Sequence, residues 1–553
     1  MLPQCRIRRG DEVPQARDVD PPFPPAAGLS SYPDRPLIRV LDPASAVRLP
    51  GQDRLHATAY VADRLLLPAD MDDADQRTAL AALAEAAAPY VEVELEDEGR
   101  TAGRNRVTLP DGEGQRTFGV TAVELRPADG RAAAPDAWAI LQAARATGRN
   151  EMVLARVQLD HVLFANVGLM GSPFHGPLPF HGPLPFHGPL AEGGAIAGYG
   201  VAGGGGRQPV TWLGAPPDRG TLTHRRPRVA VLDTGCGEHE WWDDAADPRP
   251  DAGTIVTRGA LLDASPVGLS DPGTDGERTG DLSGPLDGAI DAVAGHGTFI
   301  TGLVHQLCPD ADVLSIRVVH SDGVIIESDL VDALGGLAEL IRRHAHGEPN
   351  GLAVDVVNLS MGYYHETALD ALFDPTMYGL LEAMGRCGTV VVAAAGNDAT
   401  SRPMFPAAFA GWPDGFAPAP ADDCAPVVAV GAQNPDGTVA LFSNTGPWVQ
   451  VWAAGAALVS TVPPFDGGFQ AQGRLVVDGK VRSSLDPDNF HSGFAVWSGT
   501  SFAAPVVAGH VAAALCAASE AGDFPLADRE KDPAAAVGRA WNALEKAVGL
   551  TPS

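Results

Sequence analysis

Lysine is nearly absent from this 553-residue sequence, and acidic side chains far outnumber basic ones. Only Lys480, Lys531 and Lys546 are lysines, so arginine supplies almost all of the positive charge. The formal net charge is −30. Nucleic acid and anionic membrane surfaces both require a basic face on their partner, so we expect neither to bind this protein.

Long apolar runs are missing as well. The first residues lack the apolar core of roughly 7–15 residues that marks a secretory signal. No segment reaches the ~18 consecutive apolar residues that a membrane span needs. These absences predict a soluble protein that stays in the cytoplasm, and they leave secretion by another route open.

Cysteine is sparse, with six residues far apart in the sequence: Cys5, Cys236, Cys308, Cys387, Cys424 and Cys516. No Cys-x-x-Cys pair is present, which argues against a zinc site. A chain of this length can build a large apolar core without disulfide bonds. We therefore expect reduced thiols, most of them buried.

The sequence divides into stretches of different composition. Residues 1–45 are rich in Pro, Arg and Asp without periodicity and predict a loose arm. Residues 46–170 predict an α+β accessory domain, because strand and helix patterns alternate there. The expected strands are Ala57–Leu67, Val91–Leu95, Phe118–Leu125 and Met152–Leu159, and the expected helices are Asp75–Ala88 and Pro135–Thr147. This order of elements is that of a ferredoxin-like fold.

Residues 171–222 predict a linker. Positions 173–190 repeat Pro-Phe-His-Gly-Pro-Leu three times, and a glycine-rich stretch follows. His175, His181 and His187 in the repeats offer metal ligands, but proline-rich repeats usually form extended spacers, and we favour that interpretation.

Residues 223–553 alternate short valine-rich runs with helical patterns. The apolar runs are Arg228–Leu232, Val313–Val319, Val354–Leu359, Val390–Ala394 and Val427–Val430. Strands buried on both faces of a parallel sheet have this composition, and the intervening helices complete an α/β domain. Near the end, Asp532 and Pro533 mark the start of a helix.

Four motifs in this domain place polar side chains at the ends of elements. Asp233 ends an apolar strand in Val-Leu-Asp-Thr-Gly, and Asn397 ends another in Ala-Ala-Gly-Asn. His296 in Gly-His-Gly-Thr and Ser501 in Gly-Thr-Ser-Phe-Ala-Ala-Pro each begin a helix. The carboxyl ends of parallel strands are where α/β sheets build sites, and a helix N-terminus favours negative charge developing beside it. A single serine there would more often be a helix cap, so the argument depends on all four motifs.

In this order the motifs resemble those of the subtilisin-like serine peptidases, over about residues 223–553. The resemblance implies a parallel-sheet α/β/α fold and a serine endopeptidase that hydrolyses peptide bonds. It implies Ser501 as nucleophile, His296 as general base and Asp233 as the group that holds the imidazole. Asn397 would donate to the oxyanion. The sedolisin relatives carry Glu and Asp where this chain has His296 and Asn397, so the resemblance does not extend to them.

The resemblance also implies where a polypeptide substrate binds. Ser360, Met361 and Gly362 match the family's extended substrate-binding segment, with which a peptide would pair as an added strand. The pocket for the residue before the cut would be lined by Ala394, Ala395 and Gly396. No cofactor is required and no metal ligand is assigned; calcium stays open, because no Asp-rich ligand loop is present.

Several alternatives stay open. Secreted members of the family carry a ferredoxin-like prodomain, so residues 46–170 would either bind the chain's own active site or serve as a sensor or adaptor for a regulatory partner. A catalytically silent or merely self-processing regulatory module is the alternative to a working peptidase. The acidic segment 243–290 is expected to be a loop, with a lid or a calcium site as alternatives.

Two further expectations concern single side chains. Cys236 directly follows Asp-Thr-Gly, and we expect it to pack rather than react, with oxidant sensitivity as the alternative. Four histidines have no recognisable partner in the sequence and are predicted to lie at the surface: His239, His305, His344 and His346.

Overall fold

A computed structural model describes residues 36–52, 54–95, 106–111, 114–130, 134–165, 206–243, 254–283, 286, 288–367, 375–412, 422–468, 471, 473–527 and 532–552. The linker repeats at 173–190, with their three histidines, lie outside the described residues, as does Cys5. Within the described part, an N-terminal unit ends at Ala165 and a larger unit begins at Gly206.

The larger unit is built on a parallel sheet of seven strands. In spatial order these are β10 (Val256–Arg258), β13 (Asp312–Arg317), β9 (Arg228–Asp233), β15 (Val356–Leu359), β17 (Val390–Ala394), β18 (Val427–Gln433) and β19 (Val451–Ala454). β15 and β17 are buried along their whole length, and β13, β9 and β18 are buried except for one end residue each, as their valine-rich composition predicts. The predicted α/β fold is confirmed, with strand ends displaced by up to three residues.

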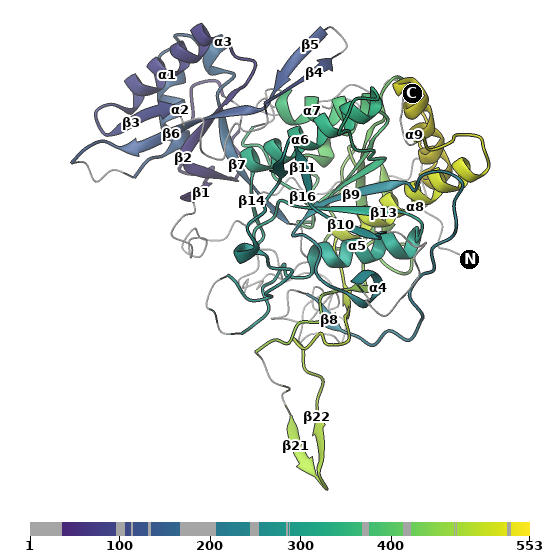
Figure 1. Cartoon of the computed structure of the whole chain (residues 1–553). Helices are drawn as coiled ribbons and strands as arrows, with labels where there is room; N and C mark the ends of the chain where they lie inside the picture. Colours follow the sequence, from purple (N-terminus) through teal and green to yellow (C-terminus); the bar gives the residue numbers. More distant parts are fainter. Residues whose placement is uncertain are drawn as a thin grey trace.

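Helices cover both faces of this sheet (Figure 1). On one side α5 (His296–Leu307) packs along α8 (Thr500–Glu520), and α9 (Pro533–Val548) packs on α8. On the other side lie α6 (Glu327–Ala345) and α7 (Pro375–Arg386), which contact each other. As predicted, Asp532 caps α9, accepting from the backbone N–H groups of Ala534 and Ala535.

Among the described helices, α8 alone is long and apolar enough to cross a membrane by length and composition. Its most apolar window is 67% buried. The helix packs against α9, α5 and the strands of the sheet. A core helix of a soluble protein passes the same test, so this helix is weak support for a membrane span.

The N-terminal unit is an antiparallel sheet in the order β7-β2-β6-β3, with helices packed on it. Its elements are β1 (Ile38–Leu41), β2 (Thr58–Pro68), α1 (Asp73–Ala87), β3 (Val91–Leu95), β4 (Val107–Asp111), β5 (Gly114–Phe118), β6 (Val120–Pro127), α2 (Ala137–Arg145), α3 (Glu151–Leu154) and β7 (Gln158–Ala165). A separate apolar core, with Leu65, Leu83 and Trp138 among its members, lies between sheet and helices. The ferredoxin-like assignment of this unit stays a prediction.

Three sequence predictions about local structure are corrected. The strand expected at Met152–Leu159 begins only at Gln158, because residues 151–154 form α3; short apolar runs suit either structure. The segment predicted as a loose arm contains β1, which pairs with β2. The predicted linker contains β8 (Gln208–Pro209), which pairs with β23 (Phe494–Trp497) of the larger unit.

The segment 243–290, expected to be a loop, contributes ordered structure in its described part. It contains β10 at the edge of the main sheet and the hairpin of β11 (Ala260–Leu262) and β12 (Ser265–Val267). It follows the short helix α4 (Glu240–Asp243). Farther along the chain, β20 (Leu458–Thr461) pairs with β23, while the hairpin of β21 (Arg474–Val477) and β22 (Lys480–Ser483) stands away from the body of the molecule (Figure 1).

The two units share hydrogen-bonded strands. β7 of the N-terminal unit lies between β14 (Val324–Ile326) and β16 (Met361–Gly362) of the larger unit, antiparallel to both. In this register Phe164 lies opposite Val324 on one side and opposite Gly362 on the other. The N-terminal unit is therefore joined to the larger one by backbone pairing as well as by side chains.

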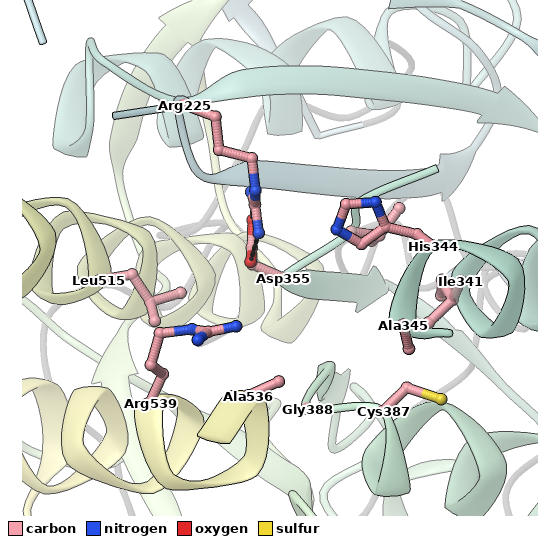
Figure 2. Close-up of a pocket in the computed structure, with 11 residues that line it drawn as sticks. Arg225, Ile341, His344, Ala345, Asp355, Cys387, Gly388, Leu515, Ala536 and Arg539 are labelled. Atoms are coloured by element: carbon pink, nitrogen blue, oxygen red, sulfur yellow. Dashed lines mark hydrogen bonds and ion pairs between the residues drawn. The ribbon is translucent and has the colours of Figure 1, made fainter. Parts of the chain in front are cut away.

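A buried ion pair closes the amino-terminal edge of the parallel sheet (Figure 2). Asp355, which precedes β15, accepts from both terminal nitrogens of Arg225 at 2.7 Å and from the backbone N–H of Arg228 at 2.8 Å. Burial opposes its ionisation, but the Arg225 charge holds the pKa of Asp355 below its usual value. The adjoining cavity measures about 20 Å³ and is also lined by Arg539, so it has room for little more than one water molecule.

Asp355→Ala tests how much this pair stabilises the fold. We expect the free energy of unfolding to fall by about 3–5 kcal/mol, because Arg225 is left buried without its partner. Equilibrium urea unfolding followed by tryptophan fluorescence measures the change. The matched control is Asp423→Asn, which removes an exposed partner of Arg386 and is expected to cost less than ~1 kcal/mol. Equal effects of the two substitutions would contradict the prediction.

Candidate active site

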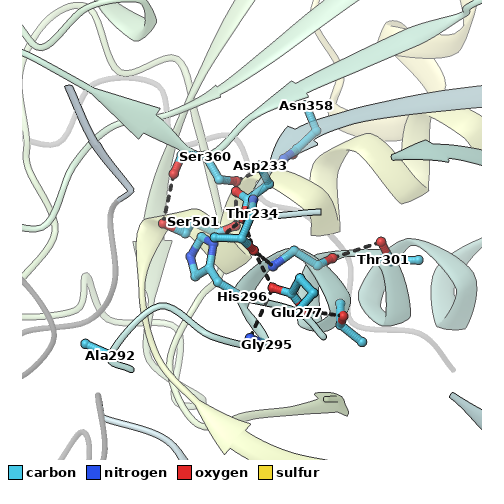
Figure 3. A network of polar contacts seen from close by, with 12 residues as sticks. Asp233, Thr234, Glu277, Ala292, Gly295, His296, Thr301, Asn358, Ser360 and Ser501 are labelled. Carbon is cyan, nitrogen blue, oxygen red and sulfur yellow. Dashed lines mark hydrogen bonds and ion pairs between the residues drawn. The ribbon is translucent and has the colours of Figure 1, made fainter. Parts of the chain in front are cut away.

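Asp233 and His296 meet at the carboxyl edge of the parallel sheet (Figure 3). Asp233 is the last residue of β9 and His296 the first of α5, and both side chains are fully buried. His296 Nδ1 lies 2.7 Å from Asp233 Oδ1. The same carboxylate oxygen accepts from the backbone N–H of Thr234 at 2.8 Å. Asp233 therefore fixes the orientation of the imidazole ring in surroundings of low dielectric constant, where such a contact is strong.

Glycine is required where α5 approaches the turn after β9. A Cβ atom on Gly297 would lie 2.1 Å from the carbonyl oxygen of Gly235. Gly295, which precedes His296, has a φ of +86°, a conformation that side chains with a Cβ rarely adopt. The glycines on either side of His296 thus allow the backbone contact that brings the histidine to Asp233.

Ser501 is the second residue of α8 and lies beside the ring of His296 (Figure 3). That ring also packs on Phe502, with ring centroids 5.1 Å apart. Ser501 Oγ donates to the carbonyl oxygen of Ser360 at 3.4 Å, while Ser360 Oγ donates to the carbonyl oxygen of Ser501 at 2.8 Å. Among the described residues, His296 Nε2 has no hydrogen-bond partner.

Asn397 lies in the turn that follows β17 and is held by Thr500. Its Oδ1 accepts from both the backbone N–H and the hydroxyl of Thr500, each at 2.9 Å. The side-chain oxygen is therefore engaged, which directs the Nδ2 donors away from Thr500. Asn444 supports the same turn by donating to the carbonyl oxygen of Ala395 at 2.9 Å and accepting from the N–H of Asp398 at 3.0 Å. The sequence offered no signal for Asn444.

The predicted substrate-binding segment is covered by the chain's own N-terminal unit. Met361 and Gly362 form β16, and β7 pairs with them at the position where the sequence analysis expects a substrate peptide. On the far side of β7, the N–H of Ala165 donates to the carbonyl oxygen of Gly323 at 3.0 Å. The sequence analysis did not predict β14, the other strand of the larger unit that pairs with β7. Ser360 is buried, as are Ala394, Ala395 and Gly396 at the end of β17.

Glu277 is a buried acid beneath the Asp233–His296 pair that sequence reasoning missed (Figure 3). Its Oε1 accepts from the hydroxyl of Thr234 and from the N–H of Gly295 at 3.1 Å, and its Oε2 accepts from the hydroxyl of Thr298 at 2.5 Å. Burial raises the pKa of Glu277 to about 7, although the two threonine hydroxyls lower it. Glu277 comes from an acidic, glycine-rich stretch without periodicity, so no pattern marks it.

Thr234 links Glu277 to Asp233. Its hydroxyl lies 3.1 Å from Asp233 Oδ1, also contacts Glu277, and accepts from the N–H of Gly297 at 2.8 Å. A hydroxyl has one proton, so it can donate to only one of the two carboxylates at a time. A protonated Glu277 would donate to Thr234 and leave the threonine proton for Asp233. The protonation of Glu277 therefore bears on the hydrogen bonding of Asp233.

Two other predictions about single residues have different outcomes. Cys236 is buried, and burial raises the pKa of its thiol to about 12, which favours packing over reaction. The five described cysteines are free thiols. The surface prediction is wrong for His239 and His305, which are buried; His239 Nε2 lies 3.0 Å from the carbonyl oxygen of Gly493, and both rings pack on Trp241. His346 is exposed, as predicted.

Glu277 should make stability depend on pH. An unfolded glutamate ionises near pH 4.5, whereas the folded Glu277 holds its proton to about pH 7. The stability that the protonated Glu277 contributes is therefore fully present below pH 4.5 and is lost as the pH rises through 7. The total loss in the free energy of unfolding is about 3 kcal/mol. Denaturant unfolding of the Ser501→Ala chain, with and without Glu277→Gln, measures this between pH 4.5 and 8. We expect the Glu277 chain to lose stability relative to the Gln variant, and parallel curves would refute the assignment.

The chain is similar to known proteins over part of its length. The thermophilic serine proteinase of Bacillus sp. (strain AK1) is 28% identical over 177 residues, which cover 30% of this chain and 36% of that protein. The extracellular protease of Xanthomonas campestris pv. campestris is 27% identical over 302 residues, 51% of this chain and 43% of that protein. The chain thus spans about a third to under a half of these relatives. Among solved structures, fervidolysin from Fervidobacterium pennivorans has a TM-score of 0.40 at 17% identity, covering 82% of this chain and 55% of that one.

A family model gives the assignment. The model described as the subtilase family, Peptidase S8, matches residues 225–524. That range begins just before β9 and ends just after α8, so it contains the whole parallel sheet and all four motifs. Because the match covers more than half of the chain, the protein belongs to the subtilase family.

Proposed function

We propose that the protein is a serine endopeptidase that hydrolyses polypeptides at Ser501. The observation that supports this best is the buried contact of 2.7 Å between His296 Nδ1 and Asp233 Oδ1, beside Ser501. A histidine held in this way presents its other nitrogen, Nε2, for proton transfer. A plain helix-capping role for Ser501 would not require such a pair.

Proton transfer needs one rotation in this structure. Ser501 Oγ donates to Ser360, so its hydroxyl must turn toward His296 Nε2 before His296 can accept the proton. Ser501 Oγ then attacks the scissile carbonyl carbon. His296 later gives the same proton to the leaving amine, while Asp233 stabilises the imidazolium. Water repeats the sequence on the acyl-enzyme and releases the second product.

Charge on the carbonyl oxygen is held by two donors in the proposed mechanism. The backbone N–H of Ser501 lies in the first turn of α8, where peptide dipoles favour negative charge. The Nδ2 group of Asn397 is the second donor, and Thr500 fixes it in place through Oδ1. Such fixed donors stabilise the transition state because they need no reorganisation as charge develops.

Substitution of the two groups tests the proposal. Ser501→Ala should lower kcat on an unstructured protein substrate by on the order of 10⁶-fold, the size known from subtilisin, and abolish labelling by a fluorophosphonate probe. Asn397→Ala should keep the labelling site but lower kcat by ~10²–10³-fold, again as in subtilisin. Intact-mass spectrometry detects the adduct. Ser483→Ala, in the hairpin of β21 and β22 that stands away from the body of the molecule, is the matched control. An adduct that persists in Ser501→Ala would refute the assignment.

We further propose that the N-terminal unit inhibits this site, rather than serving as an adaptor. The support is the position of β7, which fills the track between β14 and β16 where a substrate strand would pair. Main-chain pairing on both sides is the way an extended peptide binds in such a track. A substrate can therefore enter only after β7 has left.

Self-cleavage should remove the N-terminal unit close to the end of β7. β7 ends at Ala165, opposite Met361, and Ser360 is the next residue of the larger unit toward Ser501. We expect the cut at the first peptide bonds beyond Ala165. If the pairing continued by one residue, Asn166 would lie opposite Ser360, and the Asn166–Val167 bond would then be the one nearest Ser501. Intact mass and N-terminal sequencing locate it in wild type, and Ser501→Ala should stay whole. A full-length wild-type chain that digests added protein at the rate of the clipped enzyme would overturn the inhibitory role.

A further inference from the structure

Four titratable side chains meet, all buried, where the two units join. His161 belongs to β7, and Glu327 is the first residue of α6. His365 and Glu366 follow β16 in the larger unit. Their exposed fractions lie between 2% and 7%, so water does not solvate them. None of these residues has a part in the mechanism above.

The pairing register brings the two histidines together. Phe164 lies opposite Gly362, and the two strands run antiparallel. His161 is three residues before Phe164 and His365 is three residues after Gly362, so continuing the register places the two histidines opposite each other. Residues that face each other on antiparallel strands share a face of the sheet. Accordingly, the two rings lie edge to face, with centroids 5.1 Å apart.

His161 is held between two carboxylates. Its Nδ1 lies 2.7 Å from Glu327 Oε2, which also accepts the backbone N–H of His161 at 3.1 Å. Its Nε2 lies 2.8 Å from Glu366 Oε2. With Nδ1 carrying the proton toward Glu327, a lone pair on Nε2 would face a carboxylate at hydrogen-bond distance. Something positive must lie between them, either a second proton or a metal ion.

The surroundings of His365 favour a metal ion over a second proton. Neither of its ring nitrogens has a hydrogen-bond partner among the described residues, although the ring is buried. A proton shared by His161 and Glu366 would leave both nitrogens of His365 unsatisfied, which is unfavourable in a buried site. A metal ion would take one of them as a ligand. One ligand atom each from His161, His365 and Glu366 lies within 4.8 Å of the others.

We propose that His161, His365 and Glu366 bind a divalent transition-metal ion, with Zn²⁺ the foremost candidate. Two imidazoles and one carboxylate are a typical ligand set for Zn²⁺, and a fourth position would remain for water. Glu327 supplies the carboxylate that commonly holds the other nitrogen of a metal-binding histidine. The sequence analysis argued against a zinc site because no Cys-x-x-Cys pair is present. The ligands proposed here include no cysteine and come from distant parts of the sequence, so that pattern could not reveal them.

Charge at the site supports a cation. The carboxylates of Glu327 and Glu366 each lie within 2.8 Å of a ring nitrogen of His161, and all three side chains are buried. Two carboxylates so close together in a buried site favour a cation between them. Arg402, which donates to the carbonyl oxygen of His365 at 2.6 Å, supplies one positive charge nearby.

The ligands come from both units, so the metal would hold β7 in its place between β14 and β16, where a substrate strand would bind. This consequence rests on the proposed inhibitory role, whereas the binding site itself does not. Removing the metal should let β7 leave more readily and expose β14 and β16 to substrate.

Metal content of the full-length Ser501→Ala chain tests the site directly, since that variant cannot clip itself whether or not the chain is a peptidase. After growth with added Zn²⁺ and gel filtration, we expect about one Zn²⁺ per chain by elemental mass spectrometry. His365→Gln and Glu366→Gln should each lose it. The linker variant His175→Ala/His181→Ala/His187→Ala is the matched control and should keep it. No retained Zn²⁺, or loss only in the linker variant, would overturn the proposal.

Two further readouts separate binding from misfolding and from function. The metal-free His365→Gln chain should unfold cooperatively with a Tm unmoved by Zn²⁺, whereas Zn²⁺ should raise the Tm of its metal-free parent by several degrees. Co²⁺ should give visible absorption bands in the parent and none in the variant. In wild type, a chelator should speed self-cleavage by several-fold. Bound Zn²⁺ with unchanged self-cleavage would overturn the fastening role and leave the site established.

Discussion

The proposed active site depends on one backbone contact, the approach of the N-terminus of α5 to the turn after β9. Gly297 comes so close to the carbonyl oxygen of Gly235 that a methyl group in its place would collide with it. This contact brings His296 to Asp233, and it also places Thr234 between two buried acids, Asp233 and Glu277. The single proton of the Thr234 hydroxyl can go to only one of the two carboxylates at a time. The protonation of Glu277 therefore bears on the hydrogen bonding of Asp233.

The position of β7 follows from the same need to satisfy backbone groups. β14 and β16 are very short strands that would present unpaired N–H and carbonyl groups if β7 were absent. A peptidase must keep such edges available for its substrate, and a tethered strand can cover them at an effective concentration on the order of millimolar. Once the chain is cut after β7, the N-terminal unit is held only by non-covalent contacts and can dissociate. The inhibited and the active enzyme would then differ by the cleavage of a single peptide bond.

Local sequence signals predicted the central strands of the parallel sheet, several of the helices and the four motif residues, because each depends on neighbours in the chain. Asp233, His296, Asn397 and Ser501 stand at element ends that valine-rich runs and glycines mark clearly. Contacts between distant residues were not predictable in this way. Glu277 and Asn444 act through partners far along the chain, and nothing beside them in the sequence indicates a role. His239 and His305 were wrongly predicted to lie at the surface for the same reason. Both rings pack on Trp241, and no sequence pattern indicates that contact.

The same strand, β7, pairs with β14 and β16 and also carries His161, which contacts His365, Glu327 and Glu366. Ala165 lies at the end of β7 nearest Ser501, and His161 lies four residues back on the same strand. A shift of β7 by one residue would turn His161 away from His365 and would also move Ala165 from Met361. The contacts of His161 with Glu327 and Glu366 therefore help to hold the register in which β7 reaches the active site. A single extended strand thus carries both His161, which contacts the larger unit through Glu327 and Glu366, and the end that approaches Ser501.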